Sequence, residues 1–493
     1  MLLVACADDD AHEPAAGTSA PSTAPAPPTS RAPTQPPVRV CGNADLLLGP
    51  DSPPPGAIVV PPGDNSRIDW TQAGTTYWLA PGVHTLGGGE FDQIIPGRGA
   101  TFIGGPGAVL DGRRMNRYAF TQQAPDVRIA YLTIRGFGRG ADNHNEAVVN
   151  HDAGDDWIVE HNTIADNDGA GVFLGDGNVL RSNCLQDNGQ YGFSAYEPDG
   201  VRDVSVEGNE IVGNNRDDWE TRIEDCGCSG GAKFWDTEGA VVAGNWVHDN
   251  HGPGLWADYN NRDFVFERNY FEGNADEALF YEVSYNAVIR HNTFRRNAIG
   301  KGQRFAEAGD LFPVAAVYIS ESGGDSRVAG PPAIEVFGNV FHDNWSGITV
   351  WENADRYCGN GATPGCTLNT TATESSCVQP GISQKPLYDD CRWKSRNVKI
   401  YDNEFRVTPA NIACEALLCA RQSLLSNHGT WPPDSPYQGA VIQDAITFRQ
   451  GNVWARNRYI GPWVFVAHDL STVLDFDSWQ ADPYGQDVGS TLT

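Results

Sequence analysis

A short motif built around two asparagines recurs along the middle of this chain, and it constrains the fold more than any other feature. The motif is an Asn, any residue, an apolar residue, two further residues and a second Asn, as in 162–167 (NTIADN). Seven complete copies begin at Asn162, Asn183, Asn209, Asn245, Asn269, Asn292 and Asn339, and Asn403 begins a partial eighth copy. The regular spacings are 21 to 26 residues, whereas gaps of 36, 47 and 64 residues contain insertions. A repeat of this length indicates a solenoid.

Short β-branched runs precede the copies, for example 157–160 (WIVE) and 264–267 (FVFE), and a Gly with a second short strand follows. No period contains a helical pattern, so each repeat is expected to hold two or three strands of three to five residues. Stacked coils would place equivalent asparagines above one another. Their side-chain amides can then hydrogen-bond along the stack and satisfy the buried turns.

These copies resemble the repeats of the pectin/pectate lyase-like superfamily, which includes pectate lyases, polysaccharide epimerases and many bacterial surface proteins, lipoproteins among them. Residues 76–84 (TYWLAPGVH) and 105–112 (GPGAVLDG) are similar to the first coils of such proteins, and 127–136 (VRIAYLTIRG) to their first full coil. The resemblance covers about residues 57–351 and the region after 396. It implies an all-β fold, a right-handed parallel β-helix with long loop insertions. The repeat is structural and many functions share it, so it does not fix an activity.

The N-terminal 40 residues differ in composition from the rest of the chain. Residues 3–6 (LVAC) are similar to a bacterial lipobox, which makes Cys6 the expected lipid acceptor, although four residues can also match by chance. A basic n-region and a longer apolar stretch are missing, and a start codon placed too late would explain this. Residues 7–40 hold eight prolines among Ala, Ser and Thr, a composition typical of an extended tether. We therefore expect a secreted or cell-surface lipoprotein.

The sequence predicts six regions. They are a lipoprotein signal remnant (1–6), the tether (7–40), an N-terminal cap with opening coils (41–126), the β-helix repeats (127–351), a Cys-rich insertion (352–395), and final coils with a C-terminal cap (396–493).

Eleven cysteines also favour an exported protein, and ten remain when Cys6 is set aside. In such a protein they are expected to form disulfides that hold long loops. A zinc site is the alternative, but the spacings lack CxxC-type pairs. The clustered cysteines are Cys226 with Cys228, Cys358 with Cys366, Cys377 and Cys391, and Cys414 with Cys419.

The formal net charge of −29 restricts the partners of the chain. Such a surface repels polyanions, so nucleic acid is not an expected partner, and an acidic polysaccharide would need a local basic spot or a bridging metal ion. No run of 18 apolar residues is present, so a membrane is expected to hold the chain only through a lipid anchor. We expect a monomer.

Aligning the strand after each repeat on its Gly or Ala predicts which side chains face outward, because side chains alternate along a strand. One outward column contains Phe173, Ser194, Lys233, Trp256, Phe280, Tyr318 and Thr349, and a second contains Gly175, Tyr196, Trp235, Asp258, Glu282, Ser320 and Trp351. A solvent-facing aromatic stripe with interspersed acids suits sugar rings. The expected glycan-binding residues are therefore Tyr196, Trp235, Trp256, Phe280, Tyr318 and Trp351. In the alternative, a loop from 357–391 or near 215–230 covers the stripe and makes it core.

Asp258 and Glu282 are the strongest catalytic candidates, because they share a register on neighbouring strands about 4.8 Å apart. Two carboxylates at this spacing cannot both ionise freely, so one pKa should rise, as in a retaining glycosidase. Lys233, one coil earlier, could instead be the base of a lyase or epimerase, or neutralise a uronate. His251, in the turn that enters the groove, is a further acid or base candidate. The alternatives are a Ca²⁺ ion held by the two acids, or an ion pair with Lys233 without catalysis.

These observations predict an extracellular carbohydrate-active enzyme that acts on a polysaccharide. Hydrolysis by Asp258 and Glu282 is favoured over β-elimination, because a net charge of −29 disfavours the polyuronate that a lyase needs. The rival is a non-catalytic glycan-binding or surface-adhesion protein that uses the same stripe. No cofactor is required by this scheme, and Ca²⁺ is the one that the acids could hold.

Overall fold

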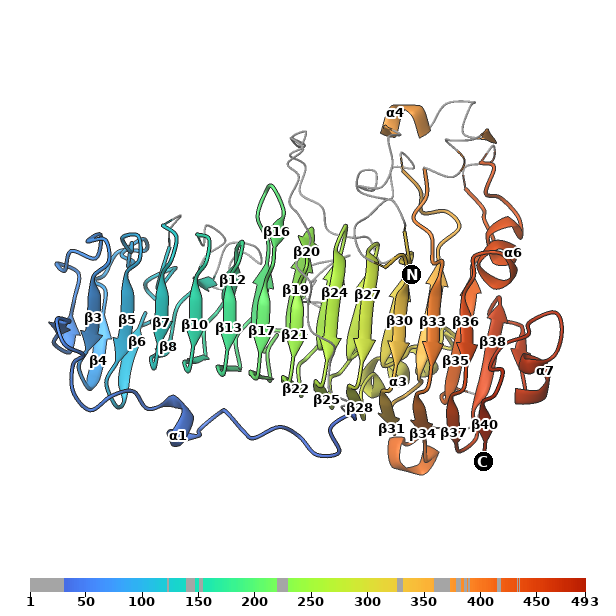
Figure 1. Cartoon of the computed structure of the whole chain (residues 1–493), viewed down its shortest axis with the longest axis horizontal. Helices are drawn as coiled ribbons and strands as arrows, with labels where there is room; N and C mark the ends of the chain where they lie inside the picture. Colours follow the sequence, from blue (N-terminus) through green and yellow to red (C-terminus); the bar gives the residue numbers. More distant parts are fainter. Residues whose placement is uncertain are drawn as a thin grey trace.

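The structure is a computed structural model, and Figure 1 shows its coils stacked in a single row from one end to the other. It describes residues 31–121, 124–138, 147–149, 154–219, 229–325, 331–358, 373–377, 383–384, 388, 391–414, 418–431, 433 and 435–493. Each regular coil contributes one strand to each of three parallel sheets. The fold is a right-handed parallel β-helix, as the repeat and the resemblance predict.

The strands are short, and consecutive members of a sheet come from consecutive coils. The first sheet, sheet A, contains β1 (Ile58–Val60), β3 (Thr76–Leu79), β5 (Thr101–Gly104), β7 (Arg128–Ala130), β10 (Ile158–Glu160), β13 (Val179–Arg181), β17 (Ser205–Glu207), β21 (Val241–Ala243), β24 (Arg262–Glu267), β27 (Tyr285–Arg290), β30 (Ile334–Phe337), β33 (Val398–Tyr401) and β36 (Val453–Ala455), with β16 (Val201–Arg202) and β20 (Thr237–Glu238) attached at its side.

The second sheet, sheet B, contains β2 (Gly63–Asp64), β4 (Gly82–Thr85), β6 (Ala108–Asp111), β8 (Thr133–Arg135), β11 (Thr163–Ala165), β14 (Cys184–Gln186), β18 (Glu210–Val212), β22 (Trp246–His248), β25 (Tyr270–Glu272), β28 (Thr293–Arg295), β31 (Val340–His342), β34 (Glu404–Arg406), β37 (Arg458–Ile460) and β40 (Thr491–Leu492). The third, sheet C, contains β9 (Ala147–Val149), β12 (Ala170–Leu174), β15 (Phe193–Ala195), β19 (Ala232–Trp235), β23 (Leu255–Asp258), β26 (Leu279–Glu282), β29 (Val317–Ser320), β32 (Ile348–Glu352), β35 (Arg421–Ser426), β38 (Val464–His468) and β39 (Val473–Leu474).

Two asparagine ladders hold the turns on either side of sheet B, and they confirm the predicted role of the motif. The first Asn of each copy donates through Nδ2 to Oδ1 of the equivalent Asn in the next coil, at 3.0 to 3.1 Å from Asn162 to Asn457. The second Asn does the same at 2.9 to 3.0 Å from Asn167 to Asn344. Asn403 is therefore a full member of the first ladder, and Asn457 adds a rung beyond the copies recognised in the sequence.

The apolar residue inside each motif forms the core beneath sheet B. In the later coils this position is aromatic, and the rings of Phe271, Phe294, Phe341, Phe405 and Tyr459 stack with centroids 4.5 to 5.1 Å apart. All five side chains are buried. Stacking of this kind adds to the free energy gained by burying the rings.

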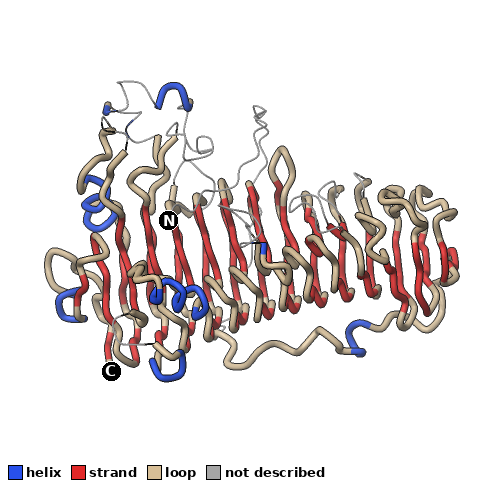
Figure 2. The backbone as a smooth tube through the Cα atoms, turned by 180° about the vertical axis from the view of Figure 1, so that it is seen from behind, coloured by secondary structure: helices blue, strands red, loops and turns tan. Residues whose placement is uncertain are grey.

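The segment 31–57 runs back along the outer face of sheet B before the first coil begins (Figures 1 and 2). It includes the short helix α1 (Ala44–Leu47). The Pro33 carbonyl accepts a 2.5 Å hydrogen bond from Thr293 Oγ1 on β28, and Cys41 forms a disulfide with Cys184 on β14. Residues 31–40, the last part of the expected tether, thus lie against the coils, whereas Cys6 and residues 7–30 lie outside the described residues.

Helices are few in the described part of the chain (Figure 2), and they lie outside the coils. Besides α1, they are α3 (Ile299–Glu307), α4 (Glu374–Cys377), the 3-10 helix η2 (Pro409–Ile412), α6 (Val441–Phe448) and α7 (Phe476–Gln480). None of these helices is long and apolar enough to cross a membrane. At the C-terminal end, Trp479 of α7 is buried against Phe465 of sheet C, with ring centroids 5.3 Å apart.

Three disulfides have both cysteines within the described residues. They confirm the expectation that cysteines of this chain form disulfides. Cys377 pairs with Cys391, and Cys414 pairs with Cys419. The third, Cys41 with Cys184, joins residues 143 positions apart and was not anticipated. Cys358 is also disulfide-bonded, and Cys226, Cys228 and Cys366 lie outside the described residues.

Candidate functional site

The two predicted columns occur in sheet C with the expected register. In the first column, Lys233 pairs with Trp256, Trp256 with Phe280, and Phe280 with Tyr318. In the second, Trp235 pairs with Asp258, and Glu282 pairs with Ser320. The strands β23 and β26 are neighbours in the sheet, so Asp258 and Glu282 end adjacent strands in the same register.

The expectation that the first column faces solvent is wrong. Trp256, Phe280 and Tyr318 are only 5%, 3% and 6% exposed. Their rings form a stack with centroid distances of 5.1 and 4.7 Å. Phe312 packs edge-on against Tyr318 at 5.6 Å, and the neighbouring Pro313 carbonyl accepts a 2.6 Å hydrogen bond from Thr349 Oγ1.

Among the described residues, the segment that packs over this ring stack is the insertion between β28 and β29, which contains α3. This insertion was not among the segments considered from the sequence. Its helix is held by Lys301, whose Nζ lies 2.9 Å from Glu277 Oε1 in the turn before β26. Trp345 contacts the helix at Gly302, where an added Cβ would lie 2.3 Å from the indole ring. The cover is therefore packed against the coils from two sides.

Asp258 is fully buried and forms an ion pair with Lys233, whose Nζ lies 3.0 Å from Oδ2. The same ammonium group lies 4.3 Å from the Trp256 ring centroid and 5.5 Å from that of Trp235. Among the described residues, Asp258 Oδ1 has no hydrogen-bond partner. A buried carboxylate oxygen without a partner is costly, and such groups often serve a function.

Glu282 is held by two donors on opposite sides of its carboxyl group. Trp256 Nε1 donates to Oε2 at 3.1 Å, and Arg356 Nη1 donates to Oε1 at 2.5 Å. Burial raises the pKa of Glu282 to about 7, with a further contribution from the charge of Asp258, although Arg356 acts in the opposite direction. The expectation that one member of the pair has a raised pKa is met by Glu282.

Arg356 and Glu321 complete the charged group, and the sequence did not single them out. Arg356 Nη1 also lies 3.2 Å from Glu321 Oε2, and both side chains are buried. Glu321 directly follows the second column at Ser320, so its place after an aligned strand was the available signal. Arg356 lies in an irregular segment after β32, where no periodic pattern predicts a position.

The other candidates lie at the margins of this group. Tyr196, Trp235 and Trp351 are half-buried, and Trp235 stacks on Tyr259 with centroids 5.0 Å apart. Trp351 packs edge-on against Phe312 at 5.3 Å. His251 is exposed in the turn before β23, and its ring makes no hydrogen bond or ion pair with Asp258 or Glu282 among the described residues. The structure therefore brings Lys233, Asp258, Trp256 and Glu282 together and leaves His251 outside the group.

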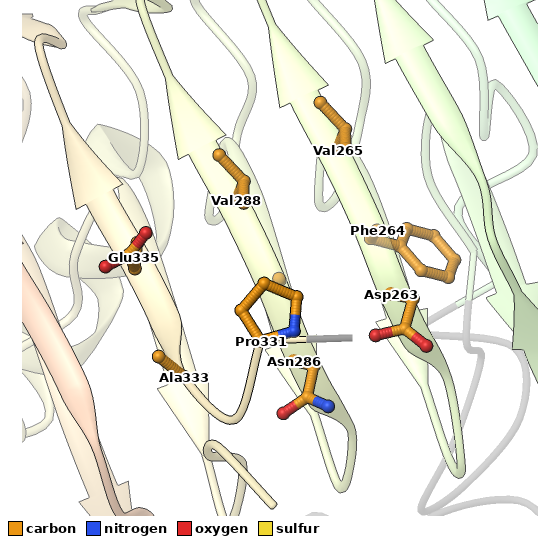
Figure 3. A pocket seen from close by; sticks show the side chains of 9 residues that line it. Asp263, Phe264, Val265, Asn286, Val288, Pro331, Ala333 and Glu335 are labelled. Atoms are coloured by element: carbon orange, nitrogen blue, oxygen red, sulfur yellow. The ribbon is translucent and has the colours of Figure 1, made fainter. Parts of the chain in front are cut away.

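Within the described ranges, no group of three or more His, Cys, Asp or Glu side chains is arranged to hold a metal ion. A separate hollow of about 130 Å³ lies on the outer face of sheet A, between β24, β27 and β30 (Figure 3). Burial and the charge of Glu238 raise the pKa of Asp263 there to about 6. This hollow contains none of the candidate residues.

Comparison with known proteins supports the fold. Residues 147–330 match the family model described as the right-handed beta helix region. No curated protein matches the sequence.

Two similar solved structures are polysaccharide-acting enzymes by their titles. The mannuronan C-5 epimerase AlgE4 A-module from Azotobacter vinelandii is 13% identical, with a TM-score of 0.44, over 72% of this chain and 87% of that chain. The catalytic unit of a GH87 alpha-1,3-glucanase from Streptomyces thermodiastaticus strain HF3-3 is also 13% identical, with a TM-score of 0.43, over 85% and 68% of the two chains. Similarity at 13% sequence identity and at these TM-scores does not show what activity this chain has.

Proposed function

We propose that this protein is an extracellular enzyme that hydrolyses a polysaccharide with Glu282 and Asp258. The observation that carries the proposal is the contrast between two carboxyl groups on adjacent strands. Glu282 has a pKa of about 7 and thus holds a proton in part of the population at neutral pH. Asp258 is ion-paired with Lys233. Two carboxyl groups in environments this different can divide the acid and nucleophile roles of glycoside hydrolysis.

In the proposed reaction, Glu282 donates its proton to the glycosidic oxygen as the bond to the sugar breaks. The carboxylate of Asp258 attacks the sugar carbon and forms a glycosyl ester. Water then attacks the same carbon, gives its proton to Glu282 and releases Asp258 as a carboxylate, so the sugar gains a hydroxyl group and both side chains return to their starting states. Trp256 and Arg356 orient the Glu282 carboxyl through their hydrogen bonds, and they act as positioning residues. The half-buried Trp235 ring lies beside Asp258 in the second column and is suited to stack on a sugar ring.

Lys233 is better suited to a charged role than to the role of a base. Its Nζ lies 3.0 Å from Asp258 Oδ2 and 4.3 Å from the Trp256 ring centroid, so an ion pair and a cation–π contact already engage the ammonium group. A lyase or epimerase that used Lys233 as its base would need the neutral amine. This contact therefore favours hydrolysis over the proton abstraction that a lyase or epimerase performs.

Asp258 has no exposed surface and Glu282 is 4% exposed, so a substrate can reach them only after a neighbouring side chain moves. Lys233 and Arg356 each expose 8% of their side chains and form the outer boundary of the group. We expect the substrate to displace one of these cations and to take its place beside the carboxyl group. An extracellular location is supported by the disulfides, which persist in oxidising compartments.

The test is a panel of neutral and acidic polysaccharides incubated with the full chain, followed by analysis of reducing ends and products. On a glycan that is cleaved, Glu282→Gln and Asp258→Asn should each lower kcat by about 10² to 10⁴-fold, the range that a general acid or base contributes, while binding is retained.

Glu277→Gln is the matched control. Glu277 is also buried and ion-paired, with Lys301, but it lies outside the proposed site. Glu277→Gln should lower the free energy of unfolding without a loss of kcat comparable to that of the two site variants. Turnover that survives both substitutions at the pair would disprove the assignment, and binding without any product would favour the non-catalytic alternative.

A further inference from the structure

A cavity of about 420 Å³ lies at the C-terminal end of the β-helix, between the segment 392–397, helix α6 and residues 450–451. Figure 1 shows α6 beside the last coils. Among the described residues, the charged side chains that line the cavity are basic, and they are Arg392, Lys394, Arg396 and Arg449. Four cationic side chains thus gather around one cavity, although the chain as a whole carries a net charge of −29.

Arg392 is the most deeply placed of the four, with 1% of its side chain exposed. It forms an ion pair with Glu352, and its guanidinium lies 4.6 Å from the Tyr437 ring centroid. Its Nη1 is buried without a hydrogen-bond partner among the described residues. Burial lowers the pKa of Arg392 to about 10, although Tyr437 and Glu321 act in the opposite direction. An uncompensated guanidinium donor is expensive to bury, so a ligand oxygen would stabilise it.

Arg392 and Arg396 pair with Glu352 and Asp325, and neither acid belongs to the lining of the cavity. Arg396 pairs with Asp325 and donates through Nε to the Gly324 carbonyl at 3.1 Å. Asp325 is buried, and so is Glu352. The carboxylates thus fix two of the guanidinium groups, while no acidic side chain from the described part of the chain lines the cavity.

The remaining two cations lie nearer to the surface. Arg449 is exposed, and its Nη2 donates a 3.4 Å hydrogen bond to the Val441 carbonyl. Lys394 is half-buried. Tyr437, Ile442 and Ala445 add apolar surface to the wall. The cavity thus combines an apolar wall with several convergent cationic donors, the usual composition of a small-molecule site.

We propose that this cavity binds a small anion that carries a carboxylate or phosphate group, with a body of monosaccharide to disaccharide size. Guanidinium groups match the planar oxygens of carboxylate and phosphate, and hydrogen bonds between charged partners are the stronger ones. The volume falls within the range of small-ligand pockets and exceeds what a single inorganic ion would fill. The site is separate from Asp258 and Glu282, and its occupancy does not depend on the proposed hydrolysis.

Isothermal titration of the full chain at low ionic strength, with glucuronate, glucose 6-phosphate and glucose as separate probes, tests the proposal. Binding of either charged sugar, but not of glucose, is the expected result, and the charged sugar that binds more tightly identifies the preferred group. The affinity should fall as salt is added, because the attraction is electrostatic. No binding of either charged sugar, or equal binding of glucose, would overturn the proposal.

Two variants locate the binding. Lys394→Gln combined with Arg449→Gln removes two peripheral cations and should weaken binding by about tenfold or more, the effect of losing charged hydrogen bonds. Arg458→Gln is the matched control, because Arg458 is exposed in the same coils but pairs with Glu404 outside the cavity. Equal affinity in the double variant and the control would place the binding elsewhere. Glu282→Gln should bind the probe normally, so failure of the proposed catalytic site is distinguished from failure of this one.

Discussion

At the scale of single residues, the central feature is a glutamic acid buried between an indole donor and a guanidinium. Glu282 accepts from Trp256 Nε1 at 3.1 Å, and it retains a pKa of about 7 even though Arg356 lies 2.5 Å away. Burial therefore outweighs the favourable charge. A group in this position titrates near neutral pH, where a general acid is most useful.

The raised pKa of Glu282 predicts a pH dependence of stability. The folded state holds the Glu282 proton up to about pH 7, whereas the unfolded chain releases it near the ordinary value of 4.5. Between these values the folded state binds more protons, so stability falls as the pH rises. Glu282→Gln removes this titration. The difference in Tm between the native protein and the variant should change between about pH 4.5 and 7 and be constant on either side. A difference that does not vary with pH would contradict the prediction.

Most residues of this site could be predicted, because their positions follow from the repeat. Lys233, Trp256, Asp258 and Glu282 were assigned to two columns by aligning one Gly or Ala per coil, and the register agrees at each of them. Arg356 could not be found in this way. It reaches Glu282 from an irregular segment 74 positions along the chain, and no local pattern encodes such a contact.

At the scale of elements, the structure of the asparagine ladders could be predicted from the sequence, whereas the structure of the insertions could not. The ladders could be predicted because the two-asparagine motif repeats with nearly constant internal spacing. The cover formed by α3 and Phe312 could not, because the 47-residue gap between Asn292 and Asn339 reveals only that an insertion exists. Phe312 of that insertion packs against Tyr318 at one end of the aromatic column, and this column, expected to face outward, is buried.

One ladder position illustrates how the coils are held. Asn245 Oδ1 accepts from Asn209 N at 2.9 Å and from Asn209 Nδ2 at 3.0 Å, and Asn245 Nδ2 donates to the Val206 carbonyl at 2.9 Å. Asn245→Ala removes these three buried hydrogen bonds, and Asn209 Nδ2 keeps only its bond to the Leu180 carbonyl. The free energy of unfolding should fall on the order of 3 to 6 kcal/mol, measured by chemical denaturation, with hydrogen exchange rising first in the adjoining coils.

Asn411→Ala serves as the control for this substitution. Asn411 is exposed, and its side chain makes one hydrogen bond, from Nδ2 to Asp343 Oδ2 at 2.7 Å. Its removal should cost less than about 1 kcal/mol. Equal losses in the two variants would mean that the ladder contributes no more than an ordinary surface contact.

At the scale of the whole molecule, the segment 31–57 ties distant coils together across the outer face of sheet B. The backbone N–H groups of Val40 and Cys41 donate to Glu210 Oε2 at 2.7 and 2.8 Å, and His248 Nε2 lies 3.3 Å from the other carboxyl oxygen. Burial raises the pKa of Glu210, but these hydrogen bonds outweigh it and leave the pKa lowered. Residues 31–40 were assigned to a tether from their composition alone. The hydrogen bonds and the disulfide that hold the segment on sheet B join residues 143 to 260 positions apart, and no local pattern in a proline-rich segment predicts such contacts.

The Cys41–Cys184 disulfide is expected to control whether this segment stays docked. Replacing both cysteines by serine removes a crosslink between residues 143 positions apart, and such long loops lose the most conformational restraint. Arg39 lies within this segment, its side chain is largely exposed, and it offers a trypsin site. Cleavage there should accelerate by roughly tenfold or more in the double serine variant. Cys414→Ser with Cys419→Ser removes a disulfide that spans only 5 positions, and it should leave the rate at Arg39 unchanged. Equal rates in the two variants would show that Glu210 and the Pro33 contact hold the segment without help from the disulfide.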